Sequence, residues 1–359
     1  MKVGIVTQPL ANNYGGILQN FALQQYLKKN GYSPMTIDFK DPPIRYSTYL
    51  YQCLKTCVAF FIPSRRHPFP RRDVNRRKDR NEAFVSKHIC KTALVGKYDS
   101  RVIEEYGIEA LVVGSDQVWR PAYNCYLEDM YLRFAAQADI PKISYAASFG
   151  VDHWEYTPEQ TEACKALAAK FDAISVREGS GIDLCDKHLG VKAVEVIDPT
   201  LLLDREDYEK VCSDVPKQKK NVLAAYVLDL TKEKLDYLHE LASAKQLEVQ
   251  IFRADLNSTL TIEGWLAMFR DAEFVITDSF HGTVFSIIFN KPFLSFTNPV
   301  RGNSRFVNLL GKFGLTDRIV SSYQKLNVPG EIQWDQVNET IAGLRAEAHN
   351  YLTNNLKCR

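Results

Sequence analysis

Short apolar runs rich in valine and isoleucine alternate along the chain with segments in which apolar residues recur at helical spacing. Runs that are apolar throughout predict strands buried on both faces, and helices between them predict a parallel sheet covered on both sides. In the first half the predicted strands are residues 3–7, 35–39, 110–114, 142–147, 173–177 and 193–198, with helices at 16–30, 158–170 and 179–189. In the second half the predicted strands are 221–227, 247–252, 273–277 and 292–296, with helices at 231–244, 261–270 and 280–289.

The pattern breaks near residues 198–207, and a polar stretch follows soon after, which predicts a domain boundary. We therefore expect an N-terminal Rossmann-like domain over residues 1–199 and a C-terminal Rossmann-like domain over residues 200–329. We also expect a helix within residues 330–359 to pack back on the N-terminal domain, because its apolar residues share one helical face. Those residues are Trp334, Val337, Ile341, Leu344 and Tyr351.

The predicted fold class is α/β, with two Rossmann-like domains facing a cleft. A length of 359 residues suits two domains, and a charged fraction of 25% is that of a globular protein rather than a disordered one. No apolar stretch approaches the about 20 residues of a membrane span, and the first apolar run is too short for a signal peptide. The eight cysteines include no C-x-x-C pair, which argues against zinc and iron–sulfur sites and favours reduced thiols in the cytoplasm.

Ligands bind such sheets at the carboxyl ends of the strands, so the residues that follow each predicted strand are the candidates for chemistry. After the first strand come Asn12, Asn13, Tyr14 and Gly15, which lead into a helix. Free backbone N–H groups at a helix N-terminus bind anions or sugars. The dinucleotide fingerprint G-x-G-x-x-G is missing from this loop. A plain turn capped by asparagine is the alternative, and we favour ligand binding because three polar residues follow the strand.

The strand at 110–114 runs into Ser115, Asp116, Gln117 and Trp119. Polar side chains of this kind bind sugar hydroxyls, and an aromatic ring packs against the C–H face of a sugar. The alternative is an aspartate cap beside a buried tryptophan. At the end of a later strand, Arg177 can bind a carboxylate or phosphate through its planar guanidinium, or it can pair with a neighbouring carboxylate. The carboxylates in question are those of Glu178 and Asp198.

The segment after residue 277 places Ser279, His281 and Gly282 in a turn between an apolar strand and an apolar helix. The N-terminus of that helix favours an anion by about 0.3–1 kcal/mol. A single histidine is more often structural, but this setting favours a function for His281, with Asp278 capping the turn or orienting the imidazole. Lys291 and Arg305 offer further cations in the same region, although solvated charges explain each of them equally well.

Taken in order, these segments resemble the polysaccharide pyruvyltransferase family. The resemblance covers nearly the whole chain, except for residues 41–95, where no family pattern is found. Its matching segments are N-N-Y-G-G-I-L-Q-N-F-A-L-Q-Q at 12–25, G-S-D-Q-V-W at 114–119, residues 145–150, S-V-R-E at 175–178, I-D-P-T-L-L-L at 197–203 and D-S-F-H-G-T at 278–283. The resemblance implies a fold similar to the GT-B glycosyltransferases.

The same resemblance implies a transferase of bacterial surface polysaccharide (capsule) biosynthesis that moves pyruvate from phosphoenolpyruvate onto two hydroxyls of a sugar as a ketal. Protonating the methylene carbon needs a general acid, and histidine suits this because imidazole titrates near about 6.5. His281 is therefore assigned as acid or phosphate ligand, Arg177 as anion clamp and Asp116 as candidate base. The expected substrate-binding residues are Asn12, Asn13, Tyr14, Gly15, Ser115, Gln117, Trp119, Ser279, Gly282, Lys291 and Arg305. We expect no metal, because the motifs hold no set of aspartate, histidine and cysteine residues at the spacing of metal ligands. We also expect no cofactor and no nucleic-acid partner.

Two alternatives to this function stay open. A GT-B glycosyltransferase that uses a nucleotide sugar would also need a helix N-terminus and basic residues for the diphosphate. A non-catalytic sugar-binding protein would keep Trp119 and Asn13 but would not need His281 among so many cations.

Residues 48–63 are apolar and aromatic with one charged residue, and eight lysines and arginines with two aspartates follow between residues 64 and 80. The apolar run is too short to span a bilayer but suits its interface, and basic residues near an anionic leaflet contribute about 1 kcal/mol each. We predict that residues 48–80 bring the enzyme to the inner face of the cytoplasmic membrane, where a lipid-linked sugar would be the acceptor. A buried helix with a solvated basic loop is one alternative, and arginines that bind the acceptor's diphosphate are another.

Overall fold

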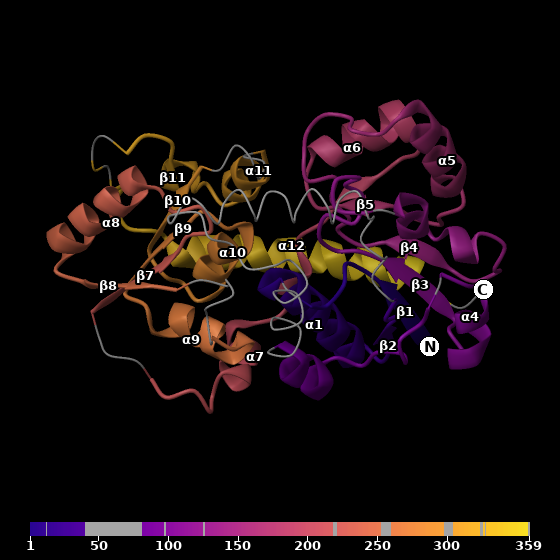
Figure 1. The fold of residues 1–359 in the computed structure, drawn as a ribbon, viewed down its shortest axis with the longest axis horizontal. Helices are drawn as coiled ribbons and strands as arrows, with labels where there is room; N and C mark the ends of the chain where they lie inside the picture. Colours follow the sequence, from indigo (N-terminus) through magenta and orange to yellow (C-terminus); the bar gives the residue numbers. More distant parts are fainter. Residues whose placement is uncertain are drawn as a thin grey trace, which may run out of the picture.

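The structure, a computed structural model, describes residues 1–11, 13–39, 81–96, 98–124, 126–217, 221–252, 260–297, 304–323, 326 and 328–357. Two α/β halves lie next to each other and a long C-terminal helix runs along both (Figure 1). The first half contains strands β1 (Lys2–Val6), β2 (Ser33–Thr36), β3 (Ala110–Val113), β4 (Lys142–Ser144), β5 (Ser175–Val176) and β6 (Val194–Glu195). The second contains β7 (Val222–Tyr226), β8 (Glu248–Ile251), β9 (Phe274–Thr277), β10 (Phe293–Phe296) and β11 (Ile319–Val320).

Helices connect these strands. In the first half they are α1 (Tyr14–Lys29), α4 (Arg101–Tyr106), α5 (Pro158–Ala168) and α6 (Ser180–Leu184), with short helical turns η2 (Leu127–Tyr131), η3 (Arg133–Ala135), η4 (Cys185–Leu189) and η5 (Pro199–Leu202). The later helices are α7 (Arg205–Val211), α8 (Lys232–Lys245), α9 (Ile262–Asp271), α10 (Phe280–Ile288), α11 (Ser304–Lys312), the turn η7 (Thr316–Arg318) and α12 (Trp334–Asn355).

Both sheets are parallel, as expected for apolar strands separated by helices. The first has the order β2-β1-β3-β4 and the second β11-β10-β9-β7-β8. Parallel bridges from Ile143 to Ala173 and from Ala147 to Val176 attach the β5–β6 pair beside β4. The predicted fold class, α/β with two Rossmann-like halves, is therefore confirmed.

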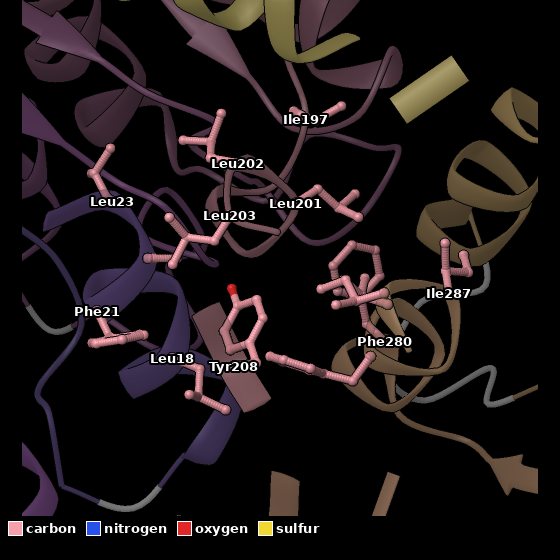
Figure 2. Close-up of a cluster of buried hydrophobic side chains, with 14 of the residues drawn as sticks. Leu18, Phe21, Leu23, Ile197, Leu201, Leu202, Leu203, Tyr208, Phe280 and Ile287 are labelled. Atoms are coloured by element: carbon pink, nitrogen blue, oxygen red, sulfur yellow. The ribbon is translucent and has the colours of Figure 1, made fainter. Parts of the chain in front are cut away.

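A continuous cluster of buried apolar side chains joins the two halves. Tyr14 of α1 packs edge-on against Trp265 of α9, with ring centroids 5.9 Å apart. The ring centroid of Tyr208 of α7 lies 6.4 Å from that of Phe21 of α1 and 4.9 Å from that of Phe285 of α10. Figure 2 shows Tyr208 between side chains of α1 and side chains of α10. The halves are thus held together by a shared core.

Helix α12 docks with the apolar face predicted from the sequence, because Val337 and Ile341 are buried in that shared core. Its polar contacts reach the first half and the segment that follows it. Arg345 donates to the carbonyl oxygens of Leu201 and Leu203, and the Tyr351 hydroxyl donates to the carbonyl of Ser144 at 2.8 Å. These contacts fix the helix along both halves, while the domain limits at residues 199 and 329 stay predictions.

Among the helices in the described part of the chain, none combines the length and the apolar character needed to cross a bilayer. Residues 48–80, on which the membrane-surface prediction rests, lie outside the described residues.

Candidate functional site

The turn between β9 and α10 fixes the position of His281. The Ser279 side chain caps α10 by accepting from the backbone N–H of Gly282 at 3.4 Å. Residue 282 must be glycine at this spot, because a Cβ there would lie 2.2 Å from Thr277 Oγ1. His281 is the second residue of α10, so its side chain leaves the first turn of the helix beside the end of β9.

Asp278, which was expected to cap the turn or to orient His281, binds the loop after β7. Its carboxylate accepts from the backbone N–H groups of Leu228 at 2.6 Å and Asp229 at 3.1 Å, and from the Lys234 ammonium at 2.8 Å. It therefore ties the end of β9 to the loop after β7.

The imidazole of His281 instead meets the first half of the chain. A Cβ added to Gly15, in the first turn of α1, would lie 2.0 Å from His281 Nδ1. On the other ring nitrogen, Nε2 lies 3.7 Å from Asp198 Oδ2, which is too long for a hydrogen bond and is an electrostatic contact. His281 Nε2 is buried and has no hydrogen-bond partner in the described structure.

Asp198 follows β6 and was not among the predicted functional residues. It caps η5, with Oδ1 accepting from Thr200 N at 3.0 Å and from Thr200 Oγ1 at 2.6 Å. Its other oxygen accepts from Arg177 Nη1 at 2.9 Å. Burial alone would raise the pKa of Asp198, but His281, Arg177 and Thr200 outweigh it and hold that pKa well below its usual value. The carboxylate is therefore ionised.

Arg177 lies among three carboxylates. Its guanidinium is 2.9 Å from Asp198, 3.5 Å from Asp116 and 3.7 Å from Glu178. Burial acts to lower the pKa of Arg177, but the three negative charges raise it overall. The alternative that Arg177 pairs with Glu178 or Asp198 is thus what the structure contains, and a ligand anion would have to compete with these groups.

Arg305 of α11 contacts the same phenylalanine ring as Arg177, that of Phe280. The guanidinium of Arg177 lies 4.5 Å from the centre of the Phe280 ring and that of Arg305 lies 5.6 Å from it, both within cation–π range. Arg305 is buried, and its burial, together with the charge of Arg177, lowers its pKa to about 10.

A pocket opens beside this cluster between the two halves. Its lining combines charged side chains with apolar ones. Its lining residues are Arg177, Glu178, Ile197, Asp198, Leu201, Phe280, Arg305, Asn308, Leu309, Lys312 and Phe313. Lys312, at the end of α11, pairs with Glu195 at 3.1 Å.

Asp116 joins the cluster from the end of β3. Its carboxylate lies 3.5 Å from Arg177 and accepts from the Asn13 side chain at 3.1 Å. Asp116 has a left-handed backbone conformation (φ 64°), which turns the chain at the end of the strand. The ends of β1, β3, β5, β6 and β9 therefore meet here, as the strand-end argument predicts.

Several predicted substrate contacts lie in the core instead. Trp119 is fully buried, stacks on Tyr131 at 4.8 Å and donates to the carbonyl of Met130 at 3.0 Å. It is a core residue in this structure and presents no exposed ring to a sugar, so the buried-tryptophan alternative is the correct one. Ser115 is also fully buried, and its hydroxyl donates to the carbonyl of Ala146 at 2.7 Å.

Other predicted contacts have structural partners or lie elsewhere. The Tyr14 hydroxyl donates to the carbonyl of Leu260 at 2.5 Å, and Gln117 Oε1 accepts from Arg120 at 3.1 Å. Lys291 follows the C-terminus of α10, at the opposite end of that helix from His281. Burial, and secondarily the charge of Arg205, lowers the pKa of Lys291. The length of α10 separates Lys291 from His281. Asn12 lies outside the described residues.

Two residues of the site were missed, Asp198 and Phe280, and the sequence carries a signal for the first of them only. Asp198 stands before a proline and at the end of a predicted strand, a position that also suits a simple cap, and only its pairing with Arg177 was considered. Phe280 lies next to His281 at the start of a largely apolar helix. The pattern of apolar and polar residues there does not indicate that its ring contacts two guanidinium groups.

The sequence model of one protein family, described as polysaccharide pyruvyl transferase, matches residues 13–299. No curated protein was found to match the chain.

Solved structures share the general arrangement at low similarity. The UDP-GlcNAc 2-epimerase of Methanocaldococcus jannaschii has a TM-score of 0.41 and 11% identity, covering 96% of this chain and 99% of that one. Arabidopsis thaliana UGT89C1 has a TM-score of 0.47 and 10% identity, covering 99% and 97%. The UDP-GlcNAc 2-epimerase of Neisseria meningitidis has a TM-score of 0.44 and 13% identity, covering 98% and 93%. TM-scores of this size support no argument about substrate.

Proposed function

Because the chain belongs to the polysaccharide pyruvyl transferase family, we propose that it transfers pyruvate from phosphoenolpyruvate to a sugar in bacterial surface polysaccharide biosynthesis. Two sugar hydroxyl oxygens bond to the central carbon of the donor, its bond to the phosphate oxygen breaks, and its methylene carbon becomes a methyl group. One hydroxyl proton is balanced by the proton that the methyl group gains, and the other leaves with the phosphate. The observation that carries this proposal is the buried cluster of His281, Arg177 and Arg305 beside the pocket.

The pocket lining suits both parts of the donor. Phosphoenolpyruvate carries a carboxylate and a phosphate at opposite sides of a small hydrocarbon unit, so cations are needed at two places. Arg177, Arg305 and Lys312 supply them, while the Phe280 ring supplies an apolar wall. Arg177 would exchange one of its carboxylate partners for the donor, and bidentate pairing of arginine with such anions favours that exchange.

His281 is the proposed proton donor to the methylene carbon, or else a ligand of the departing phosphate. Its Nε2 is buried, has no hydrogen-bond partner in the described structure, and lies 3.7 Å from the ionised Asp198. A ring nitrogen without a protein partner can donate its proton to a bound ligand, which suits an acid catalyst. Asp116 is the proposed base for the sugar hydroxyl, because its carboxylate lies beside Arg177 at the end of β3.

Turnover with phosphoenolpyruvate tests this function. The enzyme would be incubated with the donor and a panel of lipid-linked and nucleotide-linked sugars, and phosphate release and product mass would be measured. We expect a pyruvyl ketal on a hexose, and a gained hexosyl or nucleotidyl group would instead show a glycosyltransferase. His281→Ala should lower turnover by at least about 10²-fold, whereas His153→Ala, at an exposed histidine, should leave it unchanged.

We further propose that the reaction needs no metal, because cationic side chains can neutralise the phosphate by themselves. Activity should then survive EDTA, and loss of activity that Mg²⁺ restores would contradict the proposal.

The acceptor is proposed to be a lipid-linked sugar at the inner membrane face, on the basis of the sequence of residues 48–80. Co-sedimentation with anionic vesicles at low salt tests this, comparing the wild type with a variant in which arginines are changed to serine. The positions are Arg65, Arg66, Arg71 and Arg72. Negligible binding by both proteins would rule out the membrane proposal.

A further inference from the structure

His281 belongs to the second half of the chain, but two residues beside its imidazole belong to the first half. Gly15 stands in the first turn of α1, and Asp198 stands between β6 and η5. The imidazole of the second half therefore lies between two groups of the first half. Its position depends on how the two halves meet.

Gly15 leaves no spare room on one side of the ring. A Cβ at this position would be 2.0 Å from His281 Nδ1, 2.3 Å from Cγ and 2.6 Å from Cε1. These distances are far below van der Waals contact, and three of the five ring atoms are involved. Even the smallest added side chain would push the imidazole away from its present position.

Asp198 is held firmly on the other side. Thr200 donates to Oδ1 twice, from its backbone at 3.0 Å and from its hydroxyl at 2.6 Å, and Arg177 donates to Oδ2 at 2.9 Å. The side chain is 2% exposed. Because both oxygens are fixed, the carboxylate cannot turn away from His281 Nε2, which it meets at 3.7 Å.

A second contact keeps the first turn of α1 against the other half. The Tyr14 hydroxyl donates to the carbonyl of Leu260, and the Tyr14 ring packs on Trp265. Tyr14 immediately precedes Gly15 in the chain, so this contact holds the wall of Gly15 in place beside the imidazole.

We propose that Gly15 and Asp198 are positioning residues that form a socket in the first half for the imidazole of His281. The socket rests on the proposed function, in which His281 acts on phosphoenolpyruvate. It differs from a ligand-binding role for Gly15, because here the glycine acts through the histidine that it contacts. The two halves must then be correctly packed before His281 can react.

Kinetics and a spectroscopic signal test the socket together. Gly15→Ala should lower kcat by about 10²-fold, the effect of a misplacement of about 1 Å, while KM for phosphoenolpyruvate changes little. The matched control is Gly343→Ala in α12, where an added Cβ meets nothing within 4 Å. In NMR spectra, with His281→Gln used for assignment, the imidazole resonances of His281 should move in Gly15→Ala and stay in place in Gly343→Ala.

Asp198→Asn is the second variant and keeps the test decisive if Gly15→Ala fails to fold. It retains the shape of the side chain and removes the charge, so it should also shift the His281 resonances. Unchanged His281 resonances in both folded variants, or an unchanged kcat in an active enzyme, would overturn the socket. If the wild type does not use phosphoenolpyruvate but the resonances still move, the socket stands and the proposed function fails.

Discussion

Changing Asp198 to asparagine tests whether the buried ion pair with Arg177 stabilises the fold. Both side chains are almost completely buried, and Arg177 Nη1 donates to Asp198 Oδ2 at 2.9 Å. Asparagine has the same shape and could still accept from Thr200 through its oxygen. Its amide group would then point a donor at the donor of Arg177, so the variant loses both the charge and the hydrogen bond.

The magnitude follows from what remains around Arg177. Removing one partner of a buried ion pair costs about 3–5 kcal/mol, because the other charge is left in a poorly solvating environment. Here Asp116 and Glu178 still face the guanidinium, but at 3.5 Å and 3.7 Å. We therefore expect Asp198→Asn to lower the free energy of unfolding by about 3 kcal/mol at pH 7, near the lower end of that range.

The same reasoning fixes the sign of the pH dependence. His281 and Arg177 hold the pKa of Asp198 in the folded protein well below its unfolded value of about 3.9. Its contribution to stability is then complete above that unfolded pKa and is lost as the pH falls through the lower, folded pKa. Asparagine does not titrate, so the difference between the two proteins should narrow by about 1 kcal/mol between pH 6 and pH 3.

Urea unfolding followed by tryptophan fluorescence measures both effects, with the exposed Asp152→Asn as a control. Equal unfolding midpoints for the wild type and Asp198→Asn at pH 7 would show that the pair is not stabilising. A difference that stays constant down to pH 3 would show that Asp198 is not the group that titrates.

Three further predictions address the pocket, the core and the C-terminal helix. Phe280→Leu should raise KM for phosphoenolpyruvate several-fold in steady-state kinetics, because it removes the ring that both guanidinium groups contact. Burial raises the pKa of Cys164 and of Cys185 to about 12, so mass spectrometry should find both thiols unmodified by iodoacetamide at pH 8 until urea unfolds the protein. Ile341→Ala should lower the free energy of unfolding by about 2–5 kcal/mol in the same urea assay, because it removes a buried contact of α12 with the shared core.

The fold could be predicted from the sequence because its signal is local. All ten predicted strands are present, most of them with shorter limits, since apolar runs such as that of β7 are buried along their whole length. The pattern missed β11, which has two residues, and the short helices α4 and α7, which have six and seven. Short elements carry too few residues to show a period.

The site could be predicted only as far as each strand end could be considered separately. Polar residues after strands predicted Asp116, Arg177 and His281 as site residues, and the fold brings these three together. The same rule failed for Trp119, and Lys291, which follows a helix, lies elsewhere. A tryptophan beside polar residues can face either a ligand or the core, and burial against Tyr131 decides between them. A lysine after a helix can face either end of the domain, and α10 carries Lys291 away from His281.

The sequence offered Arg177 either as a clamp for a ligand anion or as the partner of a carboxylate, and the structure contains the pair. Arg177 and Lys312 each lie against carboxylates, at Asp198 and Glu195 respectively. Matched charges can be buried because each offsets the desolvation of the other, whereas unmatched arginines in a pocket would be costly to exclude from water. The partners come from segments far apart in the chain, so no window of sequence contains both members of a pair. That is why strand-by-strand reasoning named Asp198 as a possible partner of Arg177 but missed its contact with His281.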